Sequence, residues 1–80
     1  MSFFKAFLKH KARNEIDRSC DREIQQVKKD NYLKNGREMK KAKRQGKFFD
    51  GSKELSRKNS ESIRKIENKR SNRKKFIDDL

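Results

Sequence analysis

The scarcity of large apolar side chains is the feature that most limits what this chain can fold into. Leu, Ile, Val and Phe together account for 16 of its 80 residues. Highly charged chains in which such residues make up about a fifth or less of the sequence lie at the border of intrinsic disorder. A domain of this length also buries only about 60% of its extended-chain surface. We therefore expect little core and a structure that is ordered by a partner.

The same scarcity excludes several classes of protein. An enzyme needs a dry, concave pocket, which the chain has too few apolar residues to build, so we expect no catalytic activity. Nowhere do apolar residues approach the roughly 20 consecutive positions of a transmembrane helix, and no secretory signal is recognisable. His10 and Cys20 are the only residues of their types, and no group of ligands has metal spacing, so we expect neither metal nor cofactor. A lone cysteine also favours a reducing compartment, which we take to be the cytoplasm.

The pattern of the remaining residues predicts helices. The chain has no proline, and no stretch alternates apolar and polar residues as a strand does. We therefore expect an all-α fold of two to three helices, extended or hairpin-like, that forms a single unit over residues 1–80. The expected segments are an amphipathic N-terminal segment over 1–11, basic helices over 12–46, a loop over 47–51 and a C-terminal helix over 52–80.

Local signals set the expected helix ends. Asn35-Gly36 is a typical helix end or turn, and Asp50 or Ser52 is a suitable cap for the last helix, with Glu54 in its first turn. In that helix Ile63, Ile66, Ile77 and Leu80 fall on heptad-like positions, but Arg70 and Arg73 occupy the intervening heptad. The interrupted pattern predicts no self-standing coiled coil.

The N-terminal third contains two apolar faces that conflict. Phe3, Phe4, Phe7 and Leu8 share one helical face, whereas Ile16, Cys20, Ile24 and Val27 share nearly the opposite one. A straight helix cannot direct both sets at one neighbour. Either the chain breaks near residues 9–14, or one helix makes two different contacts. We favour the break, followed by a helix over about 12–29 and a second over about 31–45.

The positive charge is concentrated in the middle of the chain. The net charge is +13, and residues 28–49 contribute +7 of it, from nine cations and two carboxylates. Such a run is stabilised by phosphates, so nucleic acid is the expected partner, with RNA favoured over DNA. Tyr32 either stacks on an unpaired base or packs on Leu33 or another helix, and packing is favoured. The residues expected to bind nucleic acid are Arg18, Arg22, Lys28, Lys29, Tyr32, Lys34, Arg37, Lys40, Lys41, Lys43, Arg44, Lys47, Lys69, Arg70, Arg73, Lys74 and Lys75.

Isolated phenylalanines leave two other functions open. Phe3, Phe4, Phe7, Phe48 and Phe49 are suited to anchor a larger acidic protein, as in a small phage-like regulator or virion component. Phe48 and Phe49 alternatively cover the helices, and this is slightly favoured. Residues 2–13, basic and free of acids, also suit a membrane surface, which is the least favoured partner.

Residues 12–43 resemble the bacterial ribosomal protein numbered twenty-one of the small subunit. The similar stretches are Arg18-Ser19-Cys20-Asp21-Arg22, then Val27-Lys28-Lys29 with Tyr32 and Lys34, then Glu38-Met39-Lys40-Lys41-Ala42-Lys43. That family has a glycine where this chain has Glu23 and Ile24, and a Lys-Pro where it has Asn35-Gly36. Its extended N-terminal segment has no counterpart here, and residues 50–80 match none of it. The resemblance implies an all-helical protein lying on ribosomal RNA, without enzymatic activity.

Overall fold

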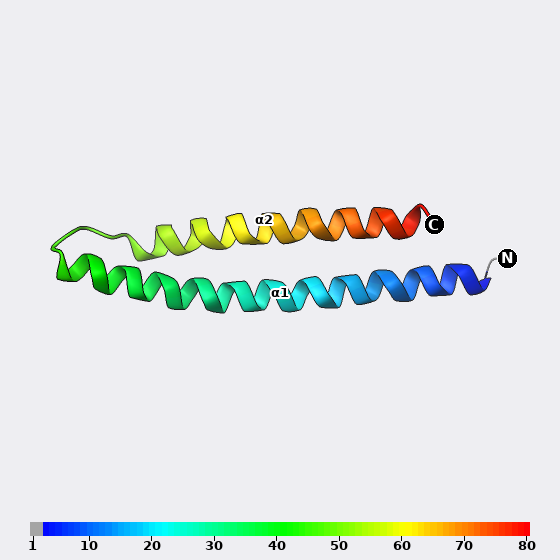
Figure 1. Cartoon of the computed structure of the whole chain (residues 1–80), viewed down its shortest axis with the longest axis horizontal. Helices are drawn as coiled ribbons and strands as arrows, with labels where there is room; N and C mark the ends of the chain where they lie inside the picture. Colours follow the sequence, from blue (N-terminus) through cyan, green and yellow to red (C-terminus); the bar gives the residue numbers. More distant parts are fainter. Residues whose placement is uncertain (1–2) are drawn as a thin grey trace.

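Two antiparallel helices make up the structure, a computed structural model that describes residues 3–80. Helix α1 spans Phe3–Arg44 and helix α2 spans Gly51–Asp78, and the two lie side by side as a hairpin (Figure 1). The molecule measures 66 × 15 × 12 Å, and its radius of gyration is 18.6 Å, compared with about 12 Å for a compact domain of this length. The all-α, extended and hairpin-like fold that the sequence predicts is confirmed.

Helix α1 is continuous, and this corrects three sequence-based expectations. There is no break near residues 9–14, no division near residue 30 and no helix end at Asn35-Gly36. A single helix carries both apolar faces: the stripe from Ile16 to Val27 faces α2, whereas Phe3, Phe4 and Phe7 are exposed. The 42 residues of α1 contain no proline, the residue that breaks a helix most strongly. The first two positions of the predicted 1–11 segment lie outside the described residues.

The end of α1 is set by Gly46. The Lys47 amide donates to the Ala42 carbonyl over 2.8 Å, and the Gly46 amide donates to the Lys43 carbonyl over 3.2 Å. These two bonds form a Schellman motif, which requires a left-handed residue after the helix. Gly46 takes that conformation, with a φ of 66°. The chain then turns back through residues 47–50.

Two glycine substitutions are expected to have opposite effects. Gly46→Ala should lower the free energy of unfolding by about 1–2 kcal/mol, since a side chain is strained in the left-handed region. Gly36→Ala should raise it by about 0.5–1 kcal/mol, because a methyl group there meets open space inside a helix. Denaturation followed by circular dichroism at 222 nm measures both. Changes of the same sign would contradict the helix end at Gly46.

Helix α2 begins one residue before the predicted position, at Gly51. Asp50 is the N-cap, and its carboxylate accepts from the Lys53 amide over 3.1 Å. Glu54 lies in the first turn, where a carboxylate interacts favourably with the helix dipole. The capping role predicted for Asp50 is confirmed.

The core between the helices is small and repeats every eleven residues. Only Cys20, Ile66 and Asn35 are buried among residues 3–80. Leu55, Ile66 and Ile77 of α2 face α1 at intervals of eleven residues. The half-buried positions 16, 27 and 38 of α1 face α2 at the same interval. An eleven-residue repeat gives 3.67 residues per turn, close to the straight α-helix, whereas a heptad gives 3.5. The apolar residues of α2 therefore follow an eleven-residue repeat and not an interrupted heptad. The seam, the line of contact between the two helices, is nearly straight.

Candidate nucleic-acid interface

Carboxylates of α1 face α2 and bind its cations. Arg70 contacts Asp17 over 3.2 Å and Asp21 over 2.8 Å, and it also contacts Glu67 of its own helix over 3.2 Å. Lys74 binds Asp17 over 2.8 Å, and Lys69 binds Glu23 over 2.7 Å. Three of the residues predicted to bind nucleic acid, Lys69, Arg70 and Lys74, thus hold the two helices together.

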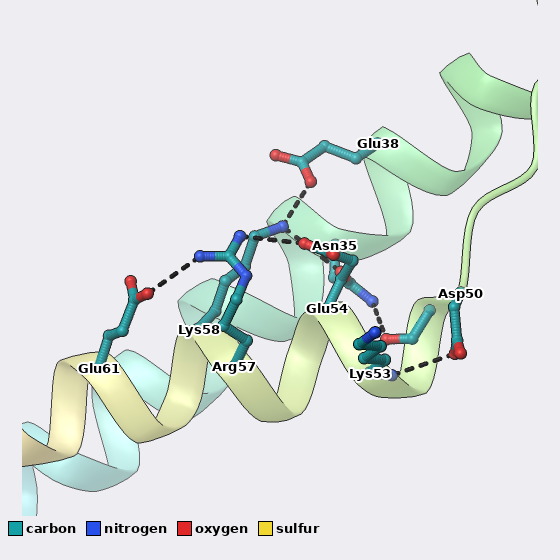
Figure 2. A network of polar contacts seen from close by, with 9 residues as sticks. Asn35, Glu38, Asp50, Lys53, Glu54, Arg57, Lys58 and Glu61 are labelled. Atoms are coloured by element: carbon teal, nitrogen blue, oxygen red, sulfur yellow. Dashed lines mark hydrogen bonds and ion pairs between the residues drawn. The ribbon is translucent and has the colours of Figure 1, made fainter.

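A second network joins the helices near the turn (Figure 2). Lys58 of α2 binds Glu38 of α1 and donates to the Asn35 Oδ1 over 3.4 Å. The Asn35 side chain is buried, and its Nδ2 donates to the Gly51 carbonyl over 2.9 Å. This bond ties the middle of α1 to the first residue of α2, so the polar side chain is satisfied without ending its own helix.

A polar layer lies between these two networks. Asn31 donates to the Asn59 Oδ1 over 3.0 Å and to the Ser62 Oγ over 3.3 Å. Because these partners must meet, the layer favours one alignment of the helices over alignments shifted by a turn. The seam is therefore held by ion pairs and amides as much as by apolar contacts.

The interhelical ion pairs perturb three carboxyl groups. Hydrogen bonds from Lys74, Lys69 and Lys58 lower the pKa of Asp17, Glu23 and Glu38, respectively, below their ordinary values. The hydrogen bond to Asp21 raises the pKa of the Arg70 guanidinium. These groups favour the folded state only while the carboxylates are ionised.

Acid is expected to destabilise the hairpin. A carboxyl whose pKa is lowered by folding stabilises the fold above its ordinary pKa, 3.8 for Asp and 4.5 for Glu, and loses this effect as the pH falls through the folded value. The melting temperature should therefore be level from pH 7 to about pH 5 and should fall below pH 4.5. The triple variant Asp17→Asn, Glu23→Gln, Glu38→Gln should melt lower at pH 7 and change much less on acidification. An equal fall in the variant would contradict this role.

A dense set of cations remains on the outer side of α1 and in the turn. We call it the basic surface. It consists of Lys28, Lys29, Lys34, Arg37, Lys40, Lys41, Lys43, Arg44 and Lys47, all exposed. Within the described chain, none of the nine lies within 4.0 Å of a carboxylate oxygen. The two acids in this stretch are Asp30, which accepts from Gln26, and Glu38, which Lys58 holds.

The other predicted cations lie apart from the basic surface. Arg18 is exposed and pairs with Glu15 over 3.3 Å, and Arg22 is exposed and, as far as the described residues go, forms no ion pair. Arg73 and Lys75 are also exposed, and they belong to the C-terminal part of α2, the end of that helix away from the turn (Figure 1). The structure thus divides the predicted cations into the nine of the basic surface, four outlying ones and the three that join the helices.

Two aromatic side chains accompany the basic surface. Tyr32 is 68% exposed, and a shallow groove of about 380 Å³ is lined by Tyr32, Leu33, Gln25, Lys28 and Lys29. Phe48 follows Lys47 in the turn and is 93% exposed, so it does not cover the helices as expected, whereas Phe49 is half-buried. Both Tyr32 and Phe48 leave ring faces open to a ligand.

The comparisons leave the family undetermined. No protein-family model, curated protein or solved structure matches this chain. The resemblance of residues 12–43 to the ribosomal protein stays a prediction. Within residues 3–80, no helix is both long and apolar enough to cross a membrane, and no three His, Cys, Asp or Glu side chains gather as metal ligands do.

Proposed function

We propose that this protein is a non-catalytic nucleic-acid-binding protein whose basic surface binds phosphates, with RNA as the favoured partner. The observation that supports the proposal is the division of charge between the two sides of α1. Four of its carboxylates, those of Asp17, Asp21, Glu23 and Glu38, bind cations of α2. Over residues 28–47, by contrast, nine cations are exposed and form no ion pair with the described residues.

Stabilisation of the helix end does not account for this charge. Lys41, Lys43 and Arg44 lie in the last turn of α1, where cations offset the helix dipole. That dipole is equivalent to only about half an elementary charge, and its effect is confined to the last turn. Most of the basic surface is left without an internal role, and a polyanion is the ligand that its charge fits.

The aromatic rings favour a partner with unpaired bases. Lysines and arginines that bind phosphates position a nucleic acid without reading its sequence. Exposed rings such as Tyr32 and Phe48 stack on bases that are not already stacked in a duplex. We therefore propose single-stranded segments, with RNA favoured also by the resemblance over residues 12–43. The buried free thiol of Cys20 accords with the proposed location in a reducing cytoplasm.

The salt dependence of binding tests this proposal. A fluorescently labelled 20-nucleotide single-stranded RNA is titrated with the full chain, and anisotropy is recorded between 50 and 200 mM salt. If six to nine phosphates are contacted, the affinity should fall on the order of 10²- to 10⁴-fold over this range. Duplex RNA and DNA of the same sequence are the comparisons. No binding at 50 mM salt, or an affinity that salt leaves unchanged, would overturn the proposal.

A further inference from the structure

A second surface lies at the open end of the hairpin, away from the turn. An open groove of about 640 Å³ runs between the helices there, with Ile16, Phe76 and Ile77 among its lining residues. A neighbouring groove of about 280 Å³ shares Ile77 and adds Leu8, Ala12 and Leu80. Since Ile77 belongs to both, the two form one surface, which we call the open-end groove.

Cations border the open-end groove, and no Asp or Glu side chain of the described residues lines it. Its charged side chains are Lys5, Lys9, Lys65, Lys69 and Arg73. Lys69 is engaged with Glu23 over 2.7 Å, and Lys9 donates to the Asp78 carbonyl over 3.3 Å. Lys5, Lys65 and Arg73 form no ion pair with the described residues. An apolar floor with unpaired cations at its edge is complementary to a ligand that is apolar on one side and acidic at the borders.

The shape of the groove indicates which kind of ligand this is. It runs beside α2 from Lys65 to the end of the helix at Asp78, which is about 20 Å, and continues to Leu80. A partner helix of about 15 residues has this length. A helix lying between two antiparallel helices buries its apolar stripe against both, and it completes a three-helix bundle. The exposed Phe76, 66% accessible, is placed to act as the aromatic anchor.

We propose that the open-end groove binds an acidic amphipathic helix of a partner protein. Nucleic acid fits this surface less well, because its floor is mainly aliphatic and offers one ring, Phe76, for stacking. A second copy of the chain also fits less well, because each copy carries a net charge of +13 and this surface is itself cationic. The proposal stands on residues outside the basic surface, so it does not depend on the proposed nucleic-acid binding.

Two designed peptides test the proposal against general charge attraction. The first is an 18-residue helix with leucines on one face and glutamates beside them. The second has the same composition in scrambled order, so that its charge is identical but its faces are mixed. With the full chain at 150 mM salt, anisotropy should show that the ordered peptide binds at least about tenfold more tightly. Equal affinities would overturn the proposal.

Substitutions then locate the binding site. Phe76→Ala and Arg73→Glu should each weaken the ordered peptide at least about tenfold, as loss of an aromatic or arginine anchor does. Phe48→Ala and Lys43→Glu make the same changes at the turn and should alter the affinity less than about twofold. All four side chains are exposed, so the helical circular dichroism signal should persist.

Other outcomes distinguish the remaining ligands. Comparable weakening by the turn variants would overturn a site at the open end. Self-association of the free chain in sedimentation velocity, if Phe76→Ala abolished it, would identify a second copy as the occupant. Nucleic acid would be identified as the occupant by two results together. Single-stranded RNA would displace the ordered peptide, and the same RNA would bind the Phe76→Ala variant more weakly than the unaltered chain. Either result would overturn the acidic helix as the ligand.

Discussion

Replacing Lys40, Lys41, Lys43 and Arg44 by glutamine is expected to weaken single-stranded RNA binding on the order of 10²- to 10³-fold at 100 mM salt. Each phosphate contact to a single strand contributes about 0.7 to the slope of log affinity against log salt. Four lost contacts should therefore lower that slope by about 2.8, and the missing counterion release accounts for the loss of affinity. Anisotropy titrations at several salt concentrations measure both quantities.

A matched variant separates the position of the charge from its amount. Lys5, Lys11, Arg64 and Lys75 are also exposed, and they lie outside the basic surface. Replacing these four by glutamine removes the same net charge but should weaken RNA binding only a few-fold, through the smaller overall field. If both quadruple variants lose affinity equally, binding is a property of the total charge, and the basic surface is not the site.

Ile66→Ala is expected to abolish most of the stability of the hairpin. The buried apolar side chains of the described chain are Cys20, fully inaccessible, and Ile66, 8% exposed. Truncating a buried isoleucine costs about 2–5 kcal/mol, and a two-helix protein with so small a core has little stability to lose. The variant should show a lower helical signal and a broad, early thermal transition in circular dichroism.

Leu33→Ala provides the control for this effect. Leu33 is on the outer side of α1 and is 62% exposed, so its truncation should change the free energy of unfolding by less than about 0.5 kcal/mol. Saturating RNA should restore part of the helical signal of Ile66→Ala, because a ligand that binds only the folded state shifts the equilibrium toward it. Equal destabilisation by the two substitutions would show that the seam is not where the stability lies.

The helical fold and the position of the turn were predictable from the sequence, but the continuity of α1 was not. Absence of proline, the Asp50 cap and the glycines correctly indicate helices and a reversal near residue 50. The error lies at Asn35-Gly36, a pair typical of helix ends. Its asparagine is instead satisfied by the Gly51 carbonyl, 16 residues away in the chain. Local propensity cannot register such a contact, because it exists only after the helices have paired.

The candidate site could be predicted only in part, because the net charge of a segment does not say which side of a helix carries it. Asp17 and Glu23 lie on the side of α1 that carries Ile16 and Cys20, and this indicates that they face another helix. That signal was present in the sequence. The assignment of Lys69, Arg70 and Lys74 to the same seam required knowing that α2 folds back on α1. The basic surface needed less information, because nine cations with two acids are basic in any fold.

The length of the hairpin places most of the basic surface beyond the range at which screened charges in the open-end groove act on it. From Ile16, which lines the open-end groove, to Lys28, where the basic surface begins, is about 18 Å along α1, and to Lys40 it is about 36 Å. Screening at physiological ionic strength reduces interactions between exposed charges beyond about 8 Å. A ligand that neutralises one end therefore leaves the affinity of the other nearly unchanged. The hairpin then acts as a rigid spacer that holds two ligands at a fixed separation and lets each bind with its own free energy.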